Sequence, residues 1–134
     1  MKSYNQFITE SKSKNSIELW SQIDKKCKKY RIENYTINSD GSIDVNGSVY
    51  ISNRNLTKLP LKFRDVSGYF DCSYNQLTTL EGSPESVGGN FYCTDNQLTT
   101  LEGSPKSVGG DFYCYNNKLV DLRGFPEYYD GDVY

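Results

Sequence analysis

One segment of the sequence is written almost twice. Residues 75–93 read NQLTTLEGSPESVGGNFYC and residues 96–114 read NQLTTLEGSPKSVGGDFYC, so two of nineteen positions differ, Glu85 against Lys106 and Asn90 against Asp111. The offset of 21 residues continues on both sides of these copies, from Gly47 to the last residue. Self-similarity at a period of roughly 20 to 50 residues is the signature of stacked structural units. The repeat therefore predicts an array whose coils contact only their neighbours, rather than a globule with one central core.

The repeat places apolar residues in fixed columns. Five columns share the spacing: Val49, Phe70, Phe91 and Phe112; Ile51, Cys72, Cys93 and Cys114; Leu56, Leu77, Leu98 and Leu119; Leu59, Leu80, Leu101 and Leu122; and Val66, Val87, Val108 and Tyr129. Alternate side chains of a strand point to opposite faces, so Phe and Cys should point into each coil and the residue between them should point out. The GG or SG pair before each strand is expected to supply backbone angles that a side chain would forbid.

The unit F-x-C-x-x-N-x-L-x-x-L resembles the leucine-rich repeat pattern, with Phe and Cys in the strand positions where leucine is usual. It is most similar to the short repeats of bacterial and tailed-phage leucine-rich proteins, whose turns read LTxLEGxP followed by VGG. The opening MKSYNQFITE also resembles the start of small proteins of large tailed phages. For residues 47–134 the resemblance implies a parallel, slightly curved solenoid with one short strand per coil. The asparagine column reads Arg54, Asn75, Asn96 and Asn117, so the first coil lacks the side chain that satisfies backbone groups inside the turn, as expected of a terminal coil.

The first 46 residues lack the repeat and predict a cap. Ser3 and Gln6 have the spacing of a capping box, which predicts a short helix over residues 4–10 that buries Tyr4, Phe7 and Ile8. Ser16 is expected to cap a second helix, with Trp20, Ile23, Cys27 and Tyr30 on one face. Ile37, Ile43, Val45, Val49 and Ile51, around SDG and NG turns, predict strands joined by tight hairpins.

The predicted fold class is therefore α+β: a short, leucine-rich-repeat-like parallel β solenoid behind an N-terminal helical and β-hairpin cap. The cap takes residues 1–46, and the solenoid takes residues 47–134 as four 21-residue coils plus a partial fifth. The closing DGDVY places Val133 in the phenylalanine column of that fifth coil. The edge of this coil could pair with another copy, so we expect a monomer or a weak dimer through the C-terminal coil.

Charge divides the chain into two parts. Residues 1–34 hold eight Lys/Arg against four Asp/Glu, and residues 35–134 hold seven against thirteen. The acidic repeats argue against nucleic-acid binding, which needs a basic face. The first residues contain no apolar signal region, and no stretch approaches the length of a membrane span. We therefore expect a cytoplasmic protein without a membrane association, located in the host cytoplasm if the chain is phage-encoded.

The cysteine column allows two interpretations, packing and ligation. Cysteines at intervals of 21 residues form a row along stacked coils, whereas a structural zinc site needs four converging ligands. The chain has no histidine to complete such a site. Ile51 occupies the same column and can pack but cannot ligate. We therefore expect buried filler, with no metal and no cofactor, and disulfides between coils are disfavoured in a reducing compartment.

The outward positions of the strands carry the candidate binding residues. Tyrosine is enriched in binding surfaces, although it also suits any exposed strand and these residues could simply cover the sheet. The candidates are Tyr50, Tyr69, Asp71, Tyr74, Asn90, Tyr92, Asp95, Asp111, Tyr113 and Tyr115. Without histidine a Ser-His or Cys-His pair is impossible, and the glycine pairs match no phosphate-binding motif, so we expect no catalytic residue and no enzyme.

These observations favour a protein–protein interaction module that presents a concave Tyr/Asp face to a protein partner, with a basic partner favoured by the acidic repeats. The phage resemblance implies a small cytosolic binder that sequesters or inhibits a host protein, such as a defence or replication factor, by steric occlusion. The alternative is a carbohydrate-binding adhesin or an accessory structural protein, because aromatic rings beside Asp and Asn also suit sugars.

Overall fold

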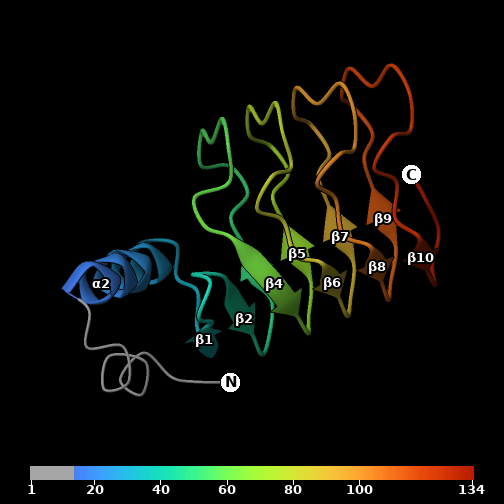
Figure 1. The fold of residues 1–134 in the computed structure, drawn as a ribbon. Coiled ribbons are helices and arrows are strands. Elements are labelled where there is room, and N and C mark those ends of the chain that lie inside the picture. Colours follow the sequence, from blue (N-terminus) through green and yellow to red (C-terminus); the bar gives the residue numbers. More distant parts are fainter. Residues whose placement is uncertain (1–13) are drawn as a thin grey trace.

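The computed structural model describes residues 14–134, and the short helix predicted over residues 4–10 lies outside this range. The described chain forms one helix followed by short strands (Figure 1). These are α2 (Lys14–Lys29), β1 (Tyr35–Ile37), β2 (Ile43–Val45), β3 (Val49–Tyr50), β4 (Phe63–Val66), β5 (Phe70–Asp71), β6 (Ser86–Val87), β7 (Phe91–Tyr92), β8 (Ser107–Val108), β9 (Phe112–Tyr113) and β10 (Tyr128–Tyr129). None of the helical structure in residues 14–134 combines the length and the apolar character that a membrane crossing requires.

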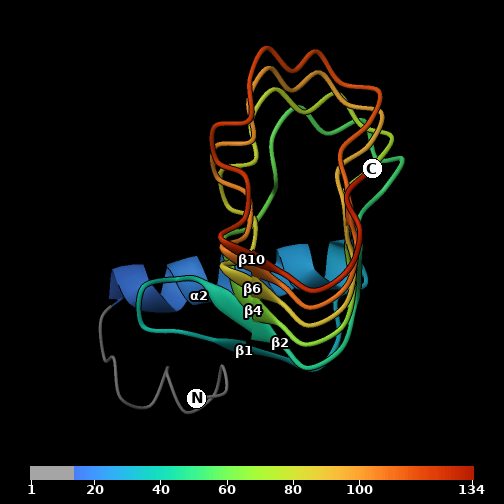
Figure 2. The same cartoon turned by 90° about the vertical axis from the view of Figure 1, so that its right-hand side faces the viewer.

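The strands build a β-solenoid of about 4 turns, and Figure 2 shows its coils stacked almost in superposition. Each full coil contributes to two sheets, ordered β1-β2-β4-β6-β8-β10 and β3-β5-β7-β9. All the strand pairs of these sheets are parallel except β1-β2. The expectation of one strand per coil is therefore wrong. The additional strands, such as β6, are two residues long between Pro84 and Gly88, and they form because each pairs in register with the coil before and the coil after it.

The N-terminal hairpin is only partly as predicted. β1 and β2 pair antiparallel, with Ile37 opposite Ile43, which confirms the hairpin at SDG. The prediction of a second hairpin at Asn46-Gly47 is wrong, because β3 pairs in parallel with β5 instead of pairing with β2. The turn at Gly47 carries the chain from one sheet of the coil to the other, and this lets both β2 and β3 bond to the next coil.

Helix α2 lies at the N-terminal end of the stack (Figure 1). Trp20, Ile23 and Cys27 are buried in the core, as their spacing predicts, and Tyr30 packs against the core just after the helix ends. The helix begins at Lys14, so Ser16 lies in its first turn and is not its N-cap. Lys14, unlike Pro or Gly, is compatible with a helical backbone, which allows the helix to extend before Ser16.

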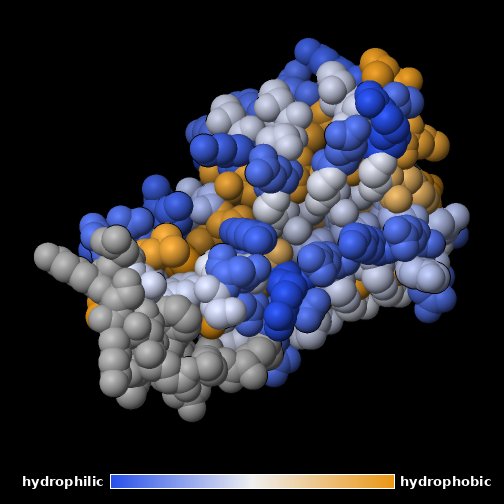
Figure 3. All heavy atoms as spheres, viewed as in Figure 1, coloured by the Kyte–Doolittle hydropathy of each residue, from blue (hydrophilic) through white to orange (hydrophobic). Residues whose placement is uncertain are grey.

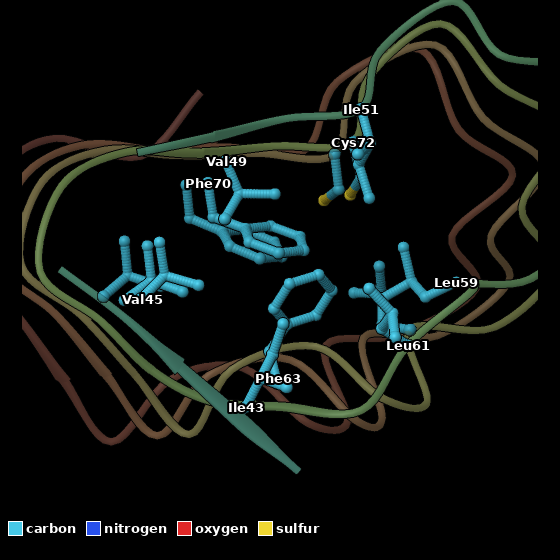
Figure 4. Close-up of a cluster of buried hydrophobic side chains, with 14 of the residues drawn as sticks. Ile43, Val45, Val49, Ile51, Leu59, Leu61, Phe63, Phe70 and Cys72 are labelled. Carbon is cyan, nitrogen blue, oxygen red and sulfur yellow. The ribbon is translucent and has the colours of Figure 1, made fainter. Parts of the chain in front are cut away.

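The interior of the solenoid consists of rows of apolar side chains from equivalent positions of successive coils. The rings of Phe70, Phe91 and Phe112 stack along the array, with centroids 5.6 and 5.3 Å apart. Figure 4 shows the cysteine sulfurs beside these rings, pointing into the core. The thiols of Cys72 and Cys93 are buried, and desolvation raises the pKa of both. The expectation that the cysteine column is buried is confirmed.

Asparagines fix the turn after each inward cysteine. The Nδ2 of Asn96 donates to the carbonyls of Cys72, Cys93 and Thr94, and its Oδ1 accepts from Leu77 N at 3.0 Å. Each amide side chain thus binds its own coil and the preceding one. Asn75 and Asn117 repeat this pattern, which explains why the first coil does without an asparagine.

The glycines before β5, β7 and β9 are required for a different reason from the expected one. Their φ angles are not positive, whereas those of Gly82 and Gly103 in the EGSP turns are 93° and 89°. Their role is close approach: a Cβ on Gly109 would lie 2.3 Å from the carbonyl oxygen of Gly88 in the preceding coil. A side chain at this corner would push the coils apart.

The C-terminal coil leaves its leucine column uncovered. Leu122 is 64% exposed, although the equivalent Leu101 one coil earlier is 0% exposed. Hydrophobic residues accordingly gather at this end of the molecule in Figure 3. Leu122 continues the leucine column of the repeat, but no further coil of the described chain covers it.

Candidate functional site

The outward side of the sheet β3-β5-β7-β9 carries a row of stacked tyrosines. The rings of Tyr92, Tyr113 and Tyr134 lie nearly parallel, with successive centroids 4.7 Å apart and interplanar angles of 11° and 12°. Their stacking follows from the parallel register, which pairs Tyr92 with Tyr113 and brings Phe112 beside Val133. We call these three residues, with Tyr50 and Asp71 in the same column, the phenol row.

Tyr134 was missing from the residues predicted for this site. The signal was present in the sequence, because Val133 falls in the phenylalanine column and the residue after it therefore falls in the column of Tyr92 and Tyr113. The phenol row thus extends one coil further than the sequence-based candidates indicate.

A second row of polar side chains holds the tyrosines in place. Asn90 Oδ1 accepts a hydrogen bond from Asp111 N at 2.7 Å, and Asp111 Oδ1 accepts one from Asp132 N at 2.8 Å, so each residue of this row secures the next coil. Asn90 Nδ2 also donates to the Tyr92 hydroxyl at 2.8 Å, and the Tyr113 hydroxyl donates to Asp111 Oδ2 at 3.3 Å. Because the hydroxyls of Tyr92, Tyr113 and Tyr134 are each hydrogen-bonded within their own coil, these three rings are arranged before any partner arrives.

The carboxylates of this second row perturb the phenols. Desolvation, followed by the negative charge of Asp111, raises the pKa of the Tyr113 hydroxyl. The charge of Asp132 is the first cause of the raised pKa of Tyr134. Both hydroxyls therefore stay protonated around neutral pH and act as hydrogen-bond donors.

The remaining candidates lie around these two rows. All ten of the predicted residues are at least partly exposed. Tyr50, Tyr69, Tyr74 and Tyr115 are the most open of them, while Asp71, Asn90, Tyr92, Asp95, Asp111 and Tyr113 are half-buried. The structure thus places all ten on the outward side of the coils that carry β3, β5, β7 and β9.

The charge of this surface has one sign. Residues 48–53, 69–74, 90–95 and 111–116 include no lysine or arginine. Within residues 14–134, none of Asp71, Asp95, Asp111 and Asp132 takes part in a salt bridge. The surface therefore carries carboxylate charge that no lysine or arginine of residues 14–134 neutralises in an ion pair. We call it the phenol face, made of the ten candidates together with Asp132 and Tyr134.

Pockets elsewhere on the molecule are weaker candidates for a functional site than the phenol face. One of about 820 Å³ lies against the other sheet and includes Tyr35, Asp44 and Asp65 in its lining. The carboxylate of Asp44 is already paired with Arg64, whose Nε donates to it at 3.0 Å. Among the described residues, no group of three or more His, Cys, Asp or Glu is placed to hold a metal ion.

Comparison of the chain with models of protein families, with curated proteins and with solved structures finds no match. The class of protein is therefore defined by its own architecture: a parallel β-solenoid whose described part includes one helix, at its N-terminal end.

Proposed function

We propose that the phenol face is a surface that binds a protein partner. The observation that carries the proposal is the stacked row Tyr92, Tyr113 and Tyr134, held by hydrogen bonds and bordered by carboxylates that lack cations. Tyrosine supplies contact area at little cost in conformational entropy, and a surface that is ordered before binding loses less entropy on association.

The acidic charge of the phenol face supports a basic partner. Complementary charge steers encounter and excludes partners of the wrong sign. On this proposal the partner presents lysine or arginine to Asp71, Asp95, Asp111 and Asp132.

Carbohydrate binding, as an adhesin or an accessory structural protein, is the second candidate and receives less support. Sugars pack best on an open aromatic face, whereas the rings of Tyr92 and Tyr113 cover one another at 4.7 Å and present mainly their edges.

The resemblance of the repeats extends the proposal. We propose that the solenoid is of the leucine-rich type, and that the protein acts in the cytoplasm by covering the functional surface of a host protein. Concave curvature of the phenol face belongs to the same proposal. Steric occlusion needs no catalytic group, which agrees with a chain that contains no histidine.

The proposal is tested by affinity capture from host cytosol with the wild type and two matched double variants. Tyr92→Ser with Tyr113→Ser removes two adjacent rings of the phenol row, while Gln97→Ala with Lys118→Ala changes two exposed, equivalent positions on the turns of adjacent coils. We expect a protein that the wild type and the turn variant capture and the phenol variant does not. Equal capture by the folded phenol variant would overturn the proposal.

A further inference from the structure

The phenol row is interrupted at one position. The strand register pairs Tyr50 with Asp71, Asp71 with Tyr92, and Tyr92 with Tyr113. Asp71 therefore stands where the next coils hold a ring, and Tyr50 and Tyr92 lie two coils apart on either side of it. Further along the row each step from ring to ring is 4.7 Å. Two such steps leave room for one flat group in stacking distance of both neighbouring rings.

The side chain at the interruption has an unused oxygen. Asp71 Oδ1 accepts hydrogen bonds from the backbone N and the hydroxyl of Ser73, which fixes the orientation of the carboxylate. In the described part of the chain, Asp71 Oδ2 has neither a hydrogen bond nor a salt bridge. By contrast, both oxygens of Asp111 accept hydrogen bonds, from Asp132 N and from the Tyr113 hydroxyl. Asp71 therefore carries a half-buried negative charge with one acceptor still open.

We propose that the gap over Asp71 is a subsite for a guanidinium group, contributed by an arginine of the protein partner. A guanidinium is flat, stacks on aromatic rings, and donates to a carboxylate in its own plane, so it would fill the missing step between the rings of Tyr50 and Tyr92 and bond to Asp71 Oδ2. A lysine ammonium could bond to the carboxylate but is not planar and could not replace a ring. This inference rests on the proposed function, of which it names the central contact.

The probe for the experiment is N-acetyl-arginine amide. N-acetyl-lysine amide, used at the same ionic strength, is the matched control. Both are titrated into the full chain while the backbone amide signals are followed by NMR. We expect saturable shifts at Tyr50, Asp71 and Tyr92 with the arginine probe, and at least fivefold weaker binding of the lysine probe. Equal affinities, or shifts spread evenly over the acidic surface, would overturn the subsite.

Three variants distinguish binding at the subsite from general electrostatic attraction to the acidic surface. Asp71→Asn keeps the acceptor for Ser73 and the room between the rings, and should weaken the arginine probe at least fivefold. Asp71→Tyr fills the gap with a ring and should abolish binding. Glu85→Gln removes the same charge from an exposed position outside the phenol face and should leave the affinity within twofold. A loss in Glu85→Gln as large as in Asp71→Asn would overturn the proposal.

The two proposals fail in different ways. If capture of a protein depends on Tyr92 and Tyr113 while the arginine probe does not bind, the guanidinium subsite is wrong and the binding face stands. If the arginine probe binds over Asp71 as described while capture survives the loss of both tyrosines, the proposed function is wrong and the subsite is a separate property of the chain.

Discussion

Replacing Asn96 by alanine tests the internal construction of the coils. Asn96 is buried between two coils, where its amide makes four hydrogen bonds: it accepts from Leu77 N and donates to the carbonyls of Cys72, Cys93 and Thr94. Alanine removes all four hydrogen bonds and leaves a small space.

The expected loss in the free energy of unfolding depends on which groups lose their last hydrogen-bond partner. Each of the three carbonyls keeps a second donor, whereas Leu77 N has no other acceptor among the described residues. A buried donor left without a partner costs about 1–3 kcal/mol, and the lost bonds to the carbonyls add about 1 kcal/mol. We expect Asn96→Ala to lower the free energy of unfolding by about 2–4 kcal/mol.

The matched variant is Asn117→Ala, one coil later. Asn117 makes the equivalent bonds to Leu98 N and to Cys93, but it is half-buried, so water can replace part of its amide. We expect a loss of about 1–2 kcal/mol there. Urea unfolding followed by far-ultraviolet circular dichroism measures both losses, with the slope checked for a broken two-state transition. A loss below about 0.5 kcal/mol for Asn96→Ala, or one smaller than that of Asn117→Ala, would refute the reasoning.

Three further predictions concern single side chains. Tyr74 holds a left-handed φ of 55°, which asparagine adopts more readily, so Tyr74→Asn should raise the free energy of unfolding by about 0.5–1 kcal/mol in a urea titration; a decrease would contradict this. Gly109→Ala should lower it by about 1–3 kcal/mol, because the new Cβ meets the carbonyl of Gly88, and an unchanged midpoint would mean that the coils lie further apart. The raised pKa of Tyr113 means that the stability it contributes is present below the ordinary tyrosine pKa and is lost as the pH rises through the raised one. Asp111→Asn should lower that pKa in an NMR titration of the ring, and an unchanged pKa would show that the carboxylate has no part in it.

Much of the fold could be predicted from the sequence, because near-identity at a fixed offset determines which residues are neighbours. The buried Phe and Cys columns follow from this spacing. The role of the asparagine column in the turn came from the resemblance to leucine-rich repeats, and its hydrogen bonds to the preceding coil appear only in the structure. The same spacing would have added Tyr134 to the candidate site.

The second strand of each coil could not be predicted. Ser86 and Val87 are two residues between proline and glycine, too short to show a period, and only pairing with neighbouring coils makes them a strand. The role of the glycines before β5, β7 and β9 could not be predicted for a related reason. They are needed because the preceding coil approaches closely, and this approach cannot be read from the local backbone.

The candidate site was predictable as a set of residues but not as a network. The sequence places tyrosine and aspartate in outward columns. It does not show that the Tyr113 hydroxyl donates to Asp111, or that Asp71 keeps an unused oxygen. Such details depend on side-chain orientation, which column spacing does not determine.

Hydroxyl-radical footprinting of the tyrosines, with and without the captured partner, shows whether the partner covers the phenol face. We expect Tyr69, Tyr113 and Tyr115 to be oxidised more slowly in the complex, while Tyr128 and Tyr129, exposed on the other sheet, keep their rates. Protection of Tyr128 and Tyr129 with unchanged oxidation of the phenol face would contradict this expectation.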